Sequence, residues 1–293
     1  MEIRNYTERE FRKLTKYSLP NTVPNTESEL FVIEDKEYWK KHHTLVKKYL
    51  QTSGEYFSNK LYTVHELIDK KHILGIEELI LPSSLFAIDG KIEGFTMPFI
   101  EKNFNLGILL NSKNVSLSKK MKALQSIGHL LEKIMKLEGL ENSFFLGDIH
   151  EWNFIYDIEK GMYRAVDLDS SKIGNNNPSI SRYLSSNDKL DYLINKYPIA
   201  GNGNHISNVE TTILSYVYMI LNTISGVKIH RLTIDEYYNY LQYLKDRGMP
   251  SELVDMFSLI YTSSRNKIDI ELLSDVPGKD SKALTYESFK KTI

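Results

Sequence analysis

The stretch from residue 144 to 170, FFLGDIHEWNFIYDIEKGMYRAVDLDS, limits the possible folds more than any other part of the chain. An apolar run is followed by a polar loop and by two short segments rich in apolar and aromatic residues, 154–156 and 163–166. A turn that contains Gly161 separates the two segments. Short apolar segments on either side of a glycine turn are typical of a β-hairpin, and we expect one here.

Acidic and amide side chains flank this predicted hairpin. Asp148 and Asn153 precede its first strand, whereas Asp167 and Asp169 follow its second. Because a tight hairpin places the start of one strand beside the end of its partner, these side chains should meet at one edge. Carboxylate and amide oxygens suit Mg²⁺, which takes one or two carboxylates together with substrate phosphates. The alternative is that they are solvated turn residues that bind no ligand.

The loop before the hairpin resembles the catalytic loop of the protein-kinase-like superfamily. Residues 147–153, GDIHEWN, are similar in style to the G-D-x-H-x-x-N loop of aminoglycoside and choline phosphotransferases. The resemblance implies that Asp148 is the catalytic base or the acid that orients the acceptor hydroxyl. It also implies that His150 lies where protein kinases carry a lysine that contacts the transferred phosphate. The first position of the loop, which is usually His, is Leu146 here.

The residues after the hairpin resemble the metal motif of the same superfamily. Residues 166–169, VDLD, are similar to its D-F-G or D-F-D sequence. The resemblance implies that Asp167 is the principal Mg²⁺ ligand, that Asn153 is a second ligand, and that Asp169 is a further candidate. The cofactors that it implies are ATP and Mg²⁺.

Two charged residues upstream match the nucleotide-binding pair of that superfamily. Residues 44–50, TLVKKYL, resemble the strand whose lysine binds the α- and β-phosphates, which assigns this role to Lys47. Lys48 is the alternative, because neighbouring residues of a strand point to opposite faces. A helix predicted over 55–71 carries Glu66 at the interval expected of the glutamate that pairs with this lysine. In isolation, Glu66 could equally be an ordinary exposed helix acid.

Two further strands are expected at 78–87 and 94–100, with a D-G turn between them. The second resembles the strand that enters the kinase hinge, with Met97 at the gatekeeper position. By this resemblance, the backbone of Pro98 and Ile100 binds adenine. Proline has no N–H group, but only its carbonyl is required at this position.

The chain departs from the kinase pattern at several places. The segment at 24–28, PNTES, has no glycine where kinases cover the phosphates with a glycine-rich loop. An apolar helix expected at 209–225 carries Thr212 where an early aspartate is usual. The segment 170–208 is rich in Ser, Asn and Gly, stands where kinases have the activation segment, and lacks an A-P-E motif. Its serines are candidates for phosphorylation, although serine in a loop is commonly only a turn residue.

The composition argues against several other classes of protein. A formal net charge of −1 gives no basic excess for binding nucleic acid. The absence of cysteine excludes disulfide scaffolds and thiol catalysis, and it fits a reducing cytoplasm. The charged N-terminus lacks the apolar core of a signal peptide, and the most apolar run, 213–224, is too short to span a bilayer. We therefore expect a soluble, cytoplasmic protein without nucleic-acid or membrane partners.

A chain of 293 residues is long enough for two lobes. We expect an α+β, bilobal protein-kinase-like fold. A β-rich N-lobe is expected over 1–100, and a mainly α-helical C-lobe over 101–293 contains an amphipathic helix at 116–137 and the catalytic hairpin at 144–170.

The resemblance implies an ATP- and Mg²⁺-dependent phosphotransferase, a kinase with an alcohol group as acceptor, and it favours a serine/threonine protein kinase. The first alternative is a small-molecule kinase of the aminoglycoside or choline type. The second is a pseudokinase that serves as a nucleotide- or protein-binding regulatory module. Whether the acceptor is a protein or a small molecule, and how many copies of the chain assemble, does not follow from the sequence.

Overall fold

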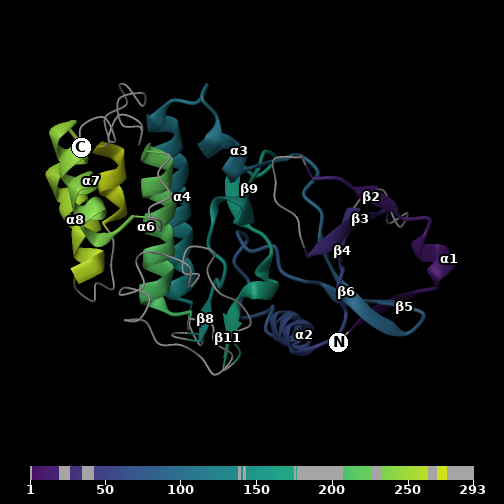
Figure 1. Cartoon of the computed structure of the whole chain (residues 1–293). Helices are drawn as coiled ribbons and strands as arrows, with labels where there is room; N and C mark the ends of the chain where they lie inside the picture. Colours follow the sequence, from purple (N-terminus) through teal and green to yellow (C-terminus); the bar gives the residue numbers. More distant parts are fainter. Residues whose placement is uncertain are drawn as a thin grey trace.

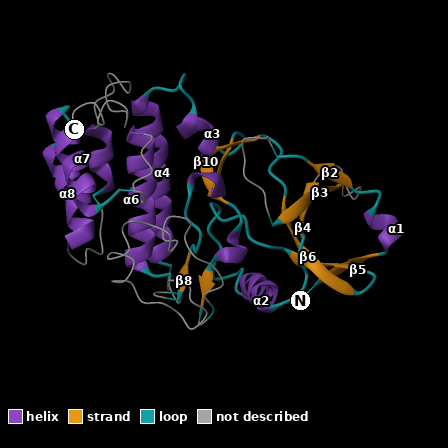
Figure 2. Cartoon of the chain, in the orientation of Figure 1, coloured by secondary structure: helices purple, strands orange, loops and turns teal. Residues whose placement is uncertain are grey.

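The computed structural model describes most of the chain, and the described residues are 2–19, 27–34, 43–137, 140, 143–174, 176, 207–225, 232–262 and 269–275. Helices and strands both occur, so the fold class is α+β, as the sequence predicts. One part of the molecule contains a six-stranded sheet with one long helix, and the other part is mainly helical (Figure 1). The strands of the predicted hairpin lie between these two parts (Figure 2).

The large sheet is antiparallel except at one edge. Its strand order is β1-β5-β6-β4-β3-β2, and β1 pairs in parallel with β5. The six strands are β1 (Ile3–Tyr6), β2 (Thr15–Tyr17), β3 (Ser28–Glu34), β4 (His43–Tyr49), β5 (Ser84–Ile88) and β6 (Lys91–Pro98). A single helical turn, α1 (Glu8–Phe11), connects β1 to β2. It begins with a capping box in which Thr7 and Glu10 each bond the backbone N–H of the other.

One helix covers one face of this sheet. The sequence predicts a helix over 55–71, and α2 (Glu55–Asp69) occupies nearly the same range. Its Phe57 and Val64 pack in one apolar cluster with Tyr49 of β4. Full burial of a side chain of this kind stabilises the fold by about 1.5–3 kcal/mol.

Strand alternation decides which lysine of β4 faces this helix. Val46 and Phe11 belong to the apolar cluster on the opposite face of the sheet. Lys48 points to that opposite face, where its Nζ lies 5.8 Å from the centre of the Phe11 ring. Lys47 and Tyr49 point to the face covered by α2. The structure therefore places Lys47, and not Lys48, on the side that faces the hairpin.

The strand expected at 78–87 is shorter in the structure, because β5 begins only at its seventh position. The residues before β5 pair with the hairpin instead. The Ala165 N–H donates to the Glu78 carbonyl at 2.8 Å, and the Ile80 N–H donates to the Ala165 carbonyl at 3.0 Å. The D-G turn that follows β5 has positive φ at both residues, as a tight hairpin turn requires. The segment before β5 thus connects the sheet to the other part of the molecule.

The helical part has one continuous apolar core. Its helices are α3 (Leu106–Asn111), α4 (Leu117–Met135), α6 (Val209–Ser225), α7 (Ile234–Asp246), α8 (Ser251–Thr262) and the 3-10 turn η5 (Ile270–Asp275). α4 confirms the amphipathic helix expected at 116–137. It packs closely on α6: the Tyr216 hydroxyl donates to the Leu124 carbonyl at 2.6 Å, and Gly128 leaves room for this hydroxyl group. None of the helices in the described ranges has the length and apolarity needed to cross a membrane.

The predicted hairpin is confirmed and belongs to a small sheet. β9 (Phe154–Asp157) pairs antiparallel with β10 (Met162–Ala165), and β7 (Asn103–Asn105) pairs with β9 on its other side. Gly161 has a φ of 66° in the turn, a conformation that other residues rarely adopt. Beside this sheet, β8 (Phe144–Phe145) pairs with β11 (Lys172–Ile173). The 3-10 turns η1 (Glu151–Asn153) and η2 (Leu168–Ser170) lie just before and just after the hairpin.

Candidate active site

The loop that precedes β9 holds the Asp148 carboxylate in place. The Asn153 side chain donates from Nδ2 to the Asp148 backbone carbonyl at 2.9 Å. His150 Nδ1 accepts from the Trp152 backbone N–H at 3.1 Å, so the proton of the neutral His150 ring lies on Nε2. Nε2 lies 3.2 Å from Asp148 Oδ2 and therefore donates to it. This contact can orient the Asp148 carboxylate, whereas the phosphate contact expected of His150 stays a prediction.

Gly147 lets this loop pack directly on the backbone that follows the hairpin. A Cβ atom on Gly147 would lie 1.8 Å from the Ser170 carbonyl oxygen, far inside van der Waals contact. Only glycine fits this close approach without a shift of one backbone or the other. The loop that carries Asp148 and the turn η2 are thus in direct contact.

Asp167 stands at the entry to η2 with an unusual backbone. Its φ of 62° and ψ of 45° place it in the left-handed region, which costs a non-glycine residue on the order of 1 kcal/mol or more. The conformation is concentrated at functional sites, and here it directs the carboxylate to the Lys47 ammonium of β4, with which it forms an ion pair. The Asp167 side chain is 39% exposed, so a ligand can reach it.

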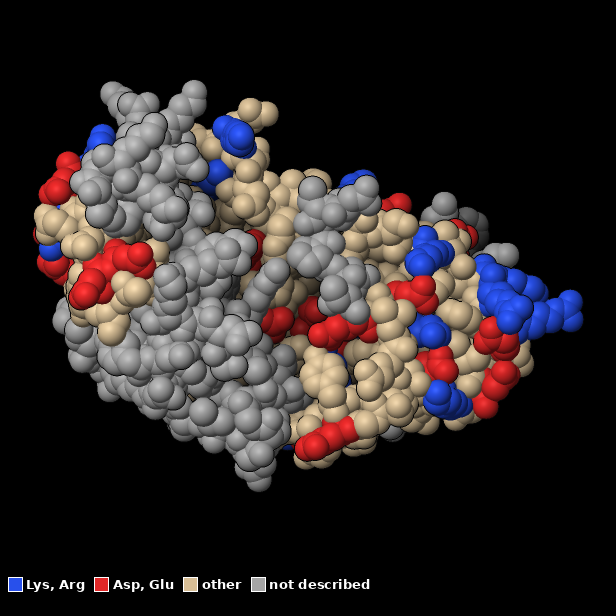
Figure 3. Space-filling view, in the orientation of Figure 1, with Lys and Arg blue, Asp and Glu red and all other residues tan. Residues whose placement is uncertain are grey.

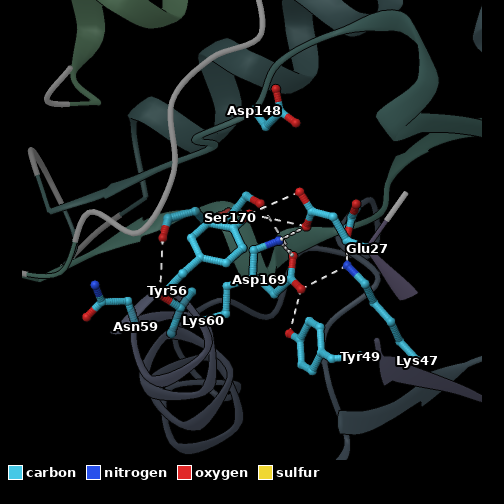
Figure 4. A network of polar contacts seen from close by, with 12 residues as sticks. Glu27, Lys47, Tyr49, Tyr56, Asn59, Lys60, Asp148, Asp169 and Ser170 are labelled. Atoms are coloured by element: carbon cyan, nitrogen blue, oxygen red, sulfur yellow. Dashed lines mark hydrogen bonds and ion pairs between the residues drawn. The ribbon is translucent and has the colours of Figure 1, made fainter. Parts of the chain in front are cut away.

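Asp169 is enclosed and holds Lys47 from the other side. Its Oδ2 lies 2.8 Å from Lys47 Nζ and accepts from the Tyr49 hydroxyl at 2.5 Å (Figure 4). Burial alone would raise the pKa of the Asp169 carboxyl, but the Lys47 and Lys60 ammonium groups outweigh burial and hold this pKa well below its ordinary value. The Asp169 side chain has no exposed surface. A metal ion would have to displace these partners, so the geometry does not support the prediction that Asp169 is a metal ligand.

The expected pair between Glu66 and Lys47 is not formed. The Glu66 carboxylate bonds the Lys70 ammonium, one helical turn further along α2. The carboxylates that pair with Lys47 belong to Asp167 and Asp169. The assignment of Glu66 to the nucleotide site is therefore corrected, and Asp169 takes the place expected of a helix glutamate.

Lys60 of α2 is a site residue that the motifs did not indicate. Its Nζ lies 2.6 Å from Glu27 Oε2 and 3.7 Å from Asp169 Oδ1. The signal that could have revealed it is helical spacing, because Lys60 stands three residues after Phe57 and four before Val64, both of which are buried. A lysine in an apolar stripe is an inward-facing residue that needs a buried partner.

Of the residues predicted to bind a metal ion, the Asp167 carboxylate and the Asn153 side-chain amide remain. The Val166 N–H donates to the Asn153 carbonyl at 3.0 Å, which places Asn153 beside the chain that leads to Asp167. Asn153 uses Nδ2 to bond the Asp148 carbonyl, which leaves its Oδ1 as the atom to face a metal ion. This small donor set fits Mg²⁺, whose remaining ligands are waters and phosphate oxygens. Within the part of the chain that the structure describes, no group of three His, Cys, Asp or Glu side chains forms a metal site.

Figure 3 shows one face of the molecule from outside. On this face, acidic side chains gather where the surface is hollowed between the sheet and the helices. Asp148 lies across from the Lys47 and Asp169 network in the close-up view (Figure 4).

The residues of the predicted adenine site lie at the end of β6 and just after it. Met97 is buried and stands opposite Leu45 of β4. Pro98 is exposed at the end of the strand. The Ile100 carbonyl accepts a hydrogen bond from the Asn103 side chain, so this predicted adenine contact already has a partner.

Other predicted features lie partly outside the described residues. Only the last two residues of the segment 24–28 are described, and of 170–208 only 170–174, 176, 207 and 208. Ser170 and Ser171 are buried. Thr212 is buried in α6, and its hydroxyl has no hydrogen-bond partner among the residues described, so it gives no sign of holding the loop of Asp148.

A search of protein-family models and of curated proteins finds no match for this chain. The evidence on function is therefore the site itself. Lys47 reaches it from the sheet, Asp148 and Asn153 from the start of the hairpin, and Asp167 from its end.

Proposed function

We propose that the protein is an ATP- and Mg²⁺-dependent phosphotransferase with a bilobal, protein-kinase-like arrangement, in which residues 1–100 form the sheet lobe. The observation that carries this proposal is the ion pair between Lys47 of the sheet and Asp167 at the end of the hairpin. A buried lysine and a reachable carboxylate are the two charges needed to hold the phosphates of a nucleotide and their metal ion. Asp148 and Asn153, at the start of the same hairpin, supply the acid and the second oxygen ligand.

In this proposal each side chain has one task. When bound, Mg²⁺ supplies positive charge that neutralises the phosphates, and Asp167 and the Asn153 amide oxygen hold it. Lys47 leaves Asp167 to bond phosphate oxygens and keeps its second partner, Asp169. Asp148 orients the acceptor hydroxyl for in-line attack on the γ-phosphorus and takes up its proton. The new bond joins the acceptor oxygen to phosphorus, the bond to the bridging oxygen breaks, and ADP leaves.

We propose a serine or threonine hydroxyl of a protein as the acceptor, because the segment 170–208 that follows the metal motif is long and rich in serine. A small molecule with an alcohol group is the alternative acceptor, which the GDIH style of the loop favours. We place the activity in the cytoplasm, with a nucleotide as partner and without nucleic acid or membrane.

The second candidate function is that of a pseudokinase, a binding module without transfer activity. The bond between the Asn103 side chain and the Ile100 carbonyl favours it, because that bond occupies one predicted contact to adenine. The absence of glycine from the segment 24–28 points the same way.

Thermal unfolding with and without ATP and Mg²⁺ tests the proposal. A ligand that binds only the folded state at a concentration of 100 Kd adds about 2.7 kcal/mol to the free energy of unfolding. For a chain of this size the midpoint should rise by roughly 4–5 °C. Asp167→Ala should abolish the part of the rise that depends on Mg²⁺. The control variant Asp246→Ala removes an exposed carboxylate of α7 and should keep the full rise.

A labelled-phosphate transfer assay then separates the two candidate functions. Transfer to a protein or small-molecule acceptor that Asp148→Asn abolishes supports the enzyme. A Mg²⁺-dependent midpoint rise without transfer to any acceptor class supports the pseudokinase. No rise with nucleotide and metal at millimolar concentration contradicts the enzyme and leaves a binding module that takes no nucleotide.

A further inference from the structure

The helix α2 faces the candidate site with a positive charge. The Lys60 side chain is only 3% exposed, yet its ammonium group reaches Glu27 at 2.6 Å and Asp169 at 3.7 Å. Its neighbours on the same helix face, Phe57 and Val64, are apolar and buried. A lysine in this setting is not a solvated surface charge, because its ammonium group is nearly enclosed by protein.

Four charged groups form an alternating row through the interior. Lys47 bonds Asp169, Asp169 lies beside Lys60, and Lys60 bonds Glu27, which is half exposed at the end of the row. The row joins β4, the turn η2, the helix α2 and the residue just before β3 (Figure 4). The Tyr56 hydroxyl donates to Glu27 at 3.1 Å and fixes the outer end.

The carboxylates of the row favour the charged form of Lys60. Burial lowers the pKa of Lys60, but the Asp169 and Asp167 carboxylates outweigh burial and hold this pKa well above its ordinary value. Removal of one member of such a buried pair leaves an uncompensated charge, which is far more costly than removal of both.

Because of Lys60, the Asp169 carboxylate is attracted to two lysines and not to Lys47 alone. With Lys60 present, the two carboxyl groups of Asp167 and Asp169 face two ammonium groups, and Glu27 adds a third acidic group at the outer end. Without Lys60, Asp167 and Asp169 would face Lys47 alone. Lys47 would then be bound more firmly to protein carboxylates, and an incoming anion would meet a more negative site.

We propose that Lys60 is a positioning residue for Lys47, which keeps the Lys47 ammonium available to the phosphates of a nucleoside triphosphate. This inference rests on the proposed function, because it concerns the same nucleotide site. The ligand class that it requires is a polyphosphate, since adenosine alone carries no charge for Lys47 to bind. In the expected arrangement, a glutamate of the helix pairs with the lysine of the sheet. Here the acidic partner, Asp169, lies on η2, and the helix α2 supplies a second cation, Lys60.

The test compares ligands with and without phosphates. In Lys60→Met the affinity for ATP with Mg²⁺ should fall at least about tenfold, whereas the affinity for adenosine should stay within about twofold. The matched control is Lys70→Met, which removes a lysine that pairs with Glu66 at the end of the same helix, and both affinities should be unchanged. Lys60→Arg retains the charge and should bind ATP within about threefold of the wild type.

A double-mutant cycle, measured by thermal unfolding, tests the interaction between Lys60 and Asp169. Lys60→Met and Asp169→Asn should each lower the unfolding midpoint, and the double variant should be more stable than the sum of the two losses predicts. This arm needs no nucleotide, and it holds even if the wild type binds none.

The outcomes separate the two proposals. An ATP affinity that is unchanged in Lys60→Met, in a wild type that binds ATP, overturns the role of Lys60 and leaves the proposed function standing. Equal losses for ATP and adenosine would reduce Lys60 to a structural residue and overturn its phosphate role. If Lys60→Met fails to fold, a folded Lys60→Arg protein that has lost ATP affinity tenfold overturns it as well. A wild type that binds no nucleotide overturns the proposed function, and with it this role.

Discussion

Replacing Tyr49 by phenylalanine would remove one hydrogen bond from the enclosed part of the site and leave the packing there intact. The Tyr49 hydroxyl donates to Asp169 Oδ2 at 2.5 Å. The ring itself packs edge-on against Phe57 at 5.4 Å between ring centres, and phenylalanine retains this contact. The substitution therefore isolates the contribution of a single donor to a buried carboxylate.

The expected loss follows from the partners that remain. A hydrogen bond to a charged group contributes about 1.5–3 kcal/mol to stability. Asp169 Oδ2 keeps the Lys47 ammonium at 2.8 Å, so the oxygen is not left without a partner. We therefore expect a loss near the lower end, about 1.5–2 kcal/mol in the free energy of unfolding. This loss corresponds to a midpoint that is lower by roughly 2–4 °C.

Urea denaturation of the wild type and Tyr49→Phe measures this loss. The control is Tyr62→Phe, because the Tyr62 side chain on α2 is 51% exposed and its hydroxyl removal should change stability by less than about 0.5 kcal/mol. A loss for Tyr49→Phe that is no larger than the loss for this control would refute the reasoning. It would mean that the hydroxyl exchanges its bond to Asp169 for water without cost.

The pH dependence gives a second check. Because the pKa of Asp169 is lowered in the folded protein, its carboxylate adds stability above the unfolded pKa of about 3.9, and this stability is lost as the pH falls through the folded pKa. Tyr49→Phe moves the folded pKa upward, so the variant has less of this stability to lose. The difference between wild type and variant should be constant from about pH 7 to pH 5 and should narrow only as the pH falls through the folded pKa of Asp169 in the variant. A difference that widens in acid would contradict the assignment.

Two further substitutions test the loop before the hairpin. Gly147→Ala would press a methyl group against the Ser170 carbonyl, and we expect a loss of about 1–3 kcal/mol in urea unfolding; a fully stable variant would show that the two backbones are not in contact. His150→Ala should lower kcat roughly 10- to 100-fold while KM for ATP changes little, because Asp148 loses its orientation and the phosphate ligands remain. His150→Gln, which can still donate to Asp148, should recover part of the loss, and equal effects on kcat and KM would contradict a positioning role.

The hairpin and the acids around it could be predicted because they depend on local rules. Alternation of apolar residues and a glycine turn define two paired strands, and the pairing then places Asn153 and Asp167 side by side. The helix α4 could be predicted for the same reason, because its apolar spacing and its serine N-cap are visible within one continuous stretch of the sequence. The strand at 78–87 was less predictable, since an extended apolar segment can pair with either neighbour, and its first part pairs with Ala165.

The partner of Lys47 could not be predicted from intervals along the chain. Residues six positions apart on an α-helix point about 120° apart around its axis, so Glu66 and Lys60 lie on different sides of α2. Burial of Phe57 and Val64 sets the rotation of α2, and this rotation turns Lys60 inward. An expected interval alone carries no information on that rotation.

The role of Asp169 depends on contacts that no local pattern contains. Lys47, with which it pairs, lies 122 residues earlier in the chain. The sequence indicates that both residues are charged, and it indicates that β4 and the hairpin exist. That Asp169 is turned inward and Asp167 outward depends on the left-handed backbone of Asp167, which is set by the tertiary structure.

The small sheet β10-β9-β7 is where the backbone of the sheet part meets the helical part. The segment at 78–80 pairs with it at Ala165, and the chain that leaves β6 joins it as β7. The helix α2 makes a second connection between the two parts, because the Asn176 side chain donates to the Asn59 carbonyl at 3.1 Å. Asp167 stands two residues beyond Ala165, next to the small sheet. Under the proposed function, the residue that would hold the cation therefore lies beside the place where the backbones of the two parts join.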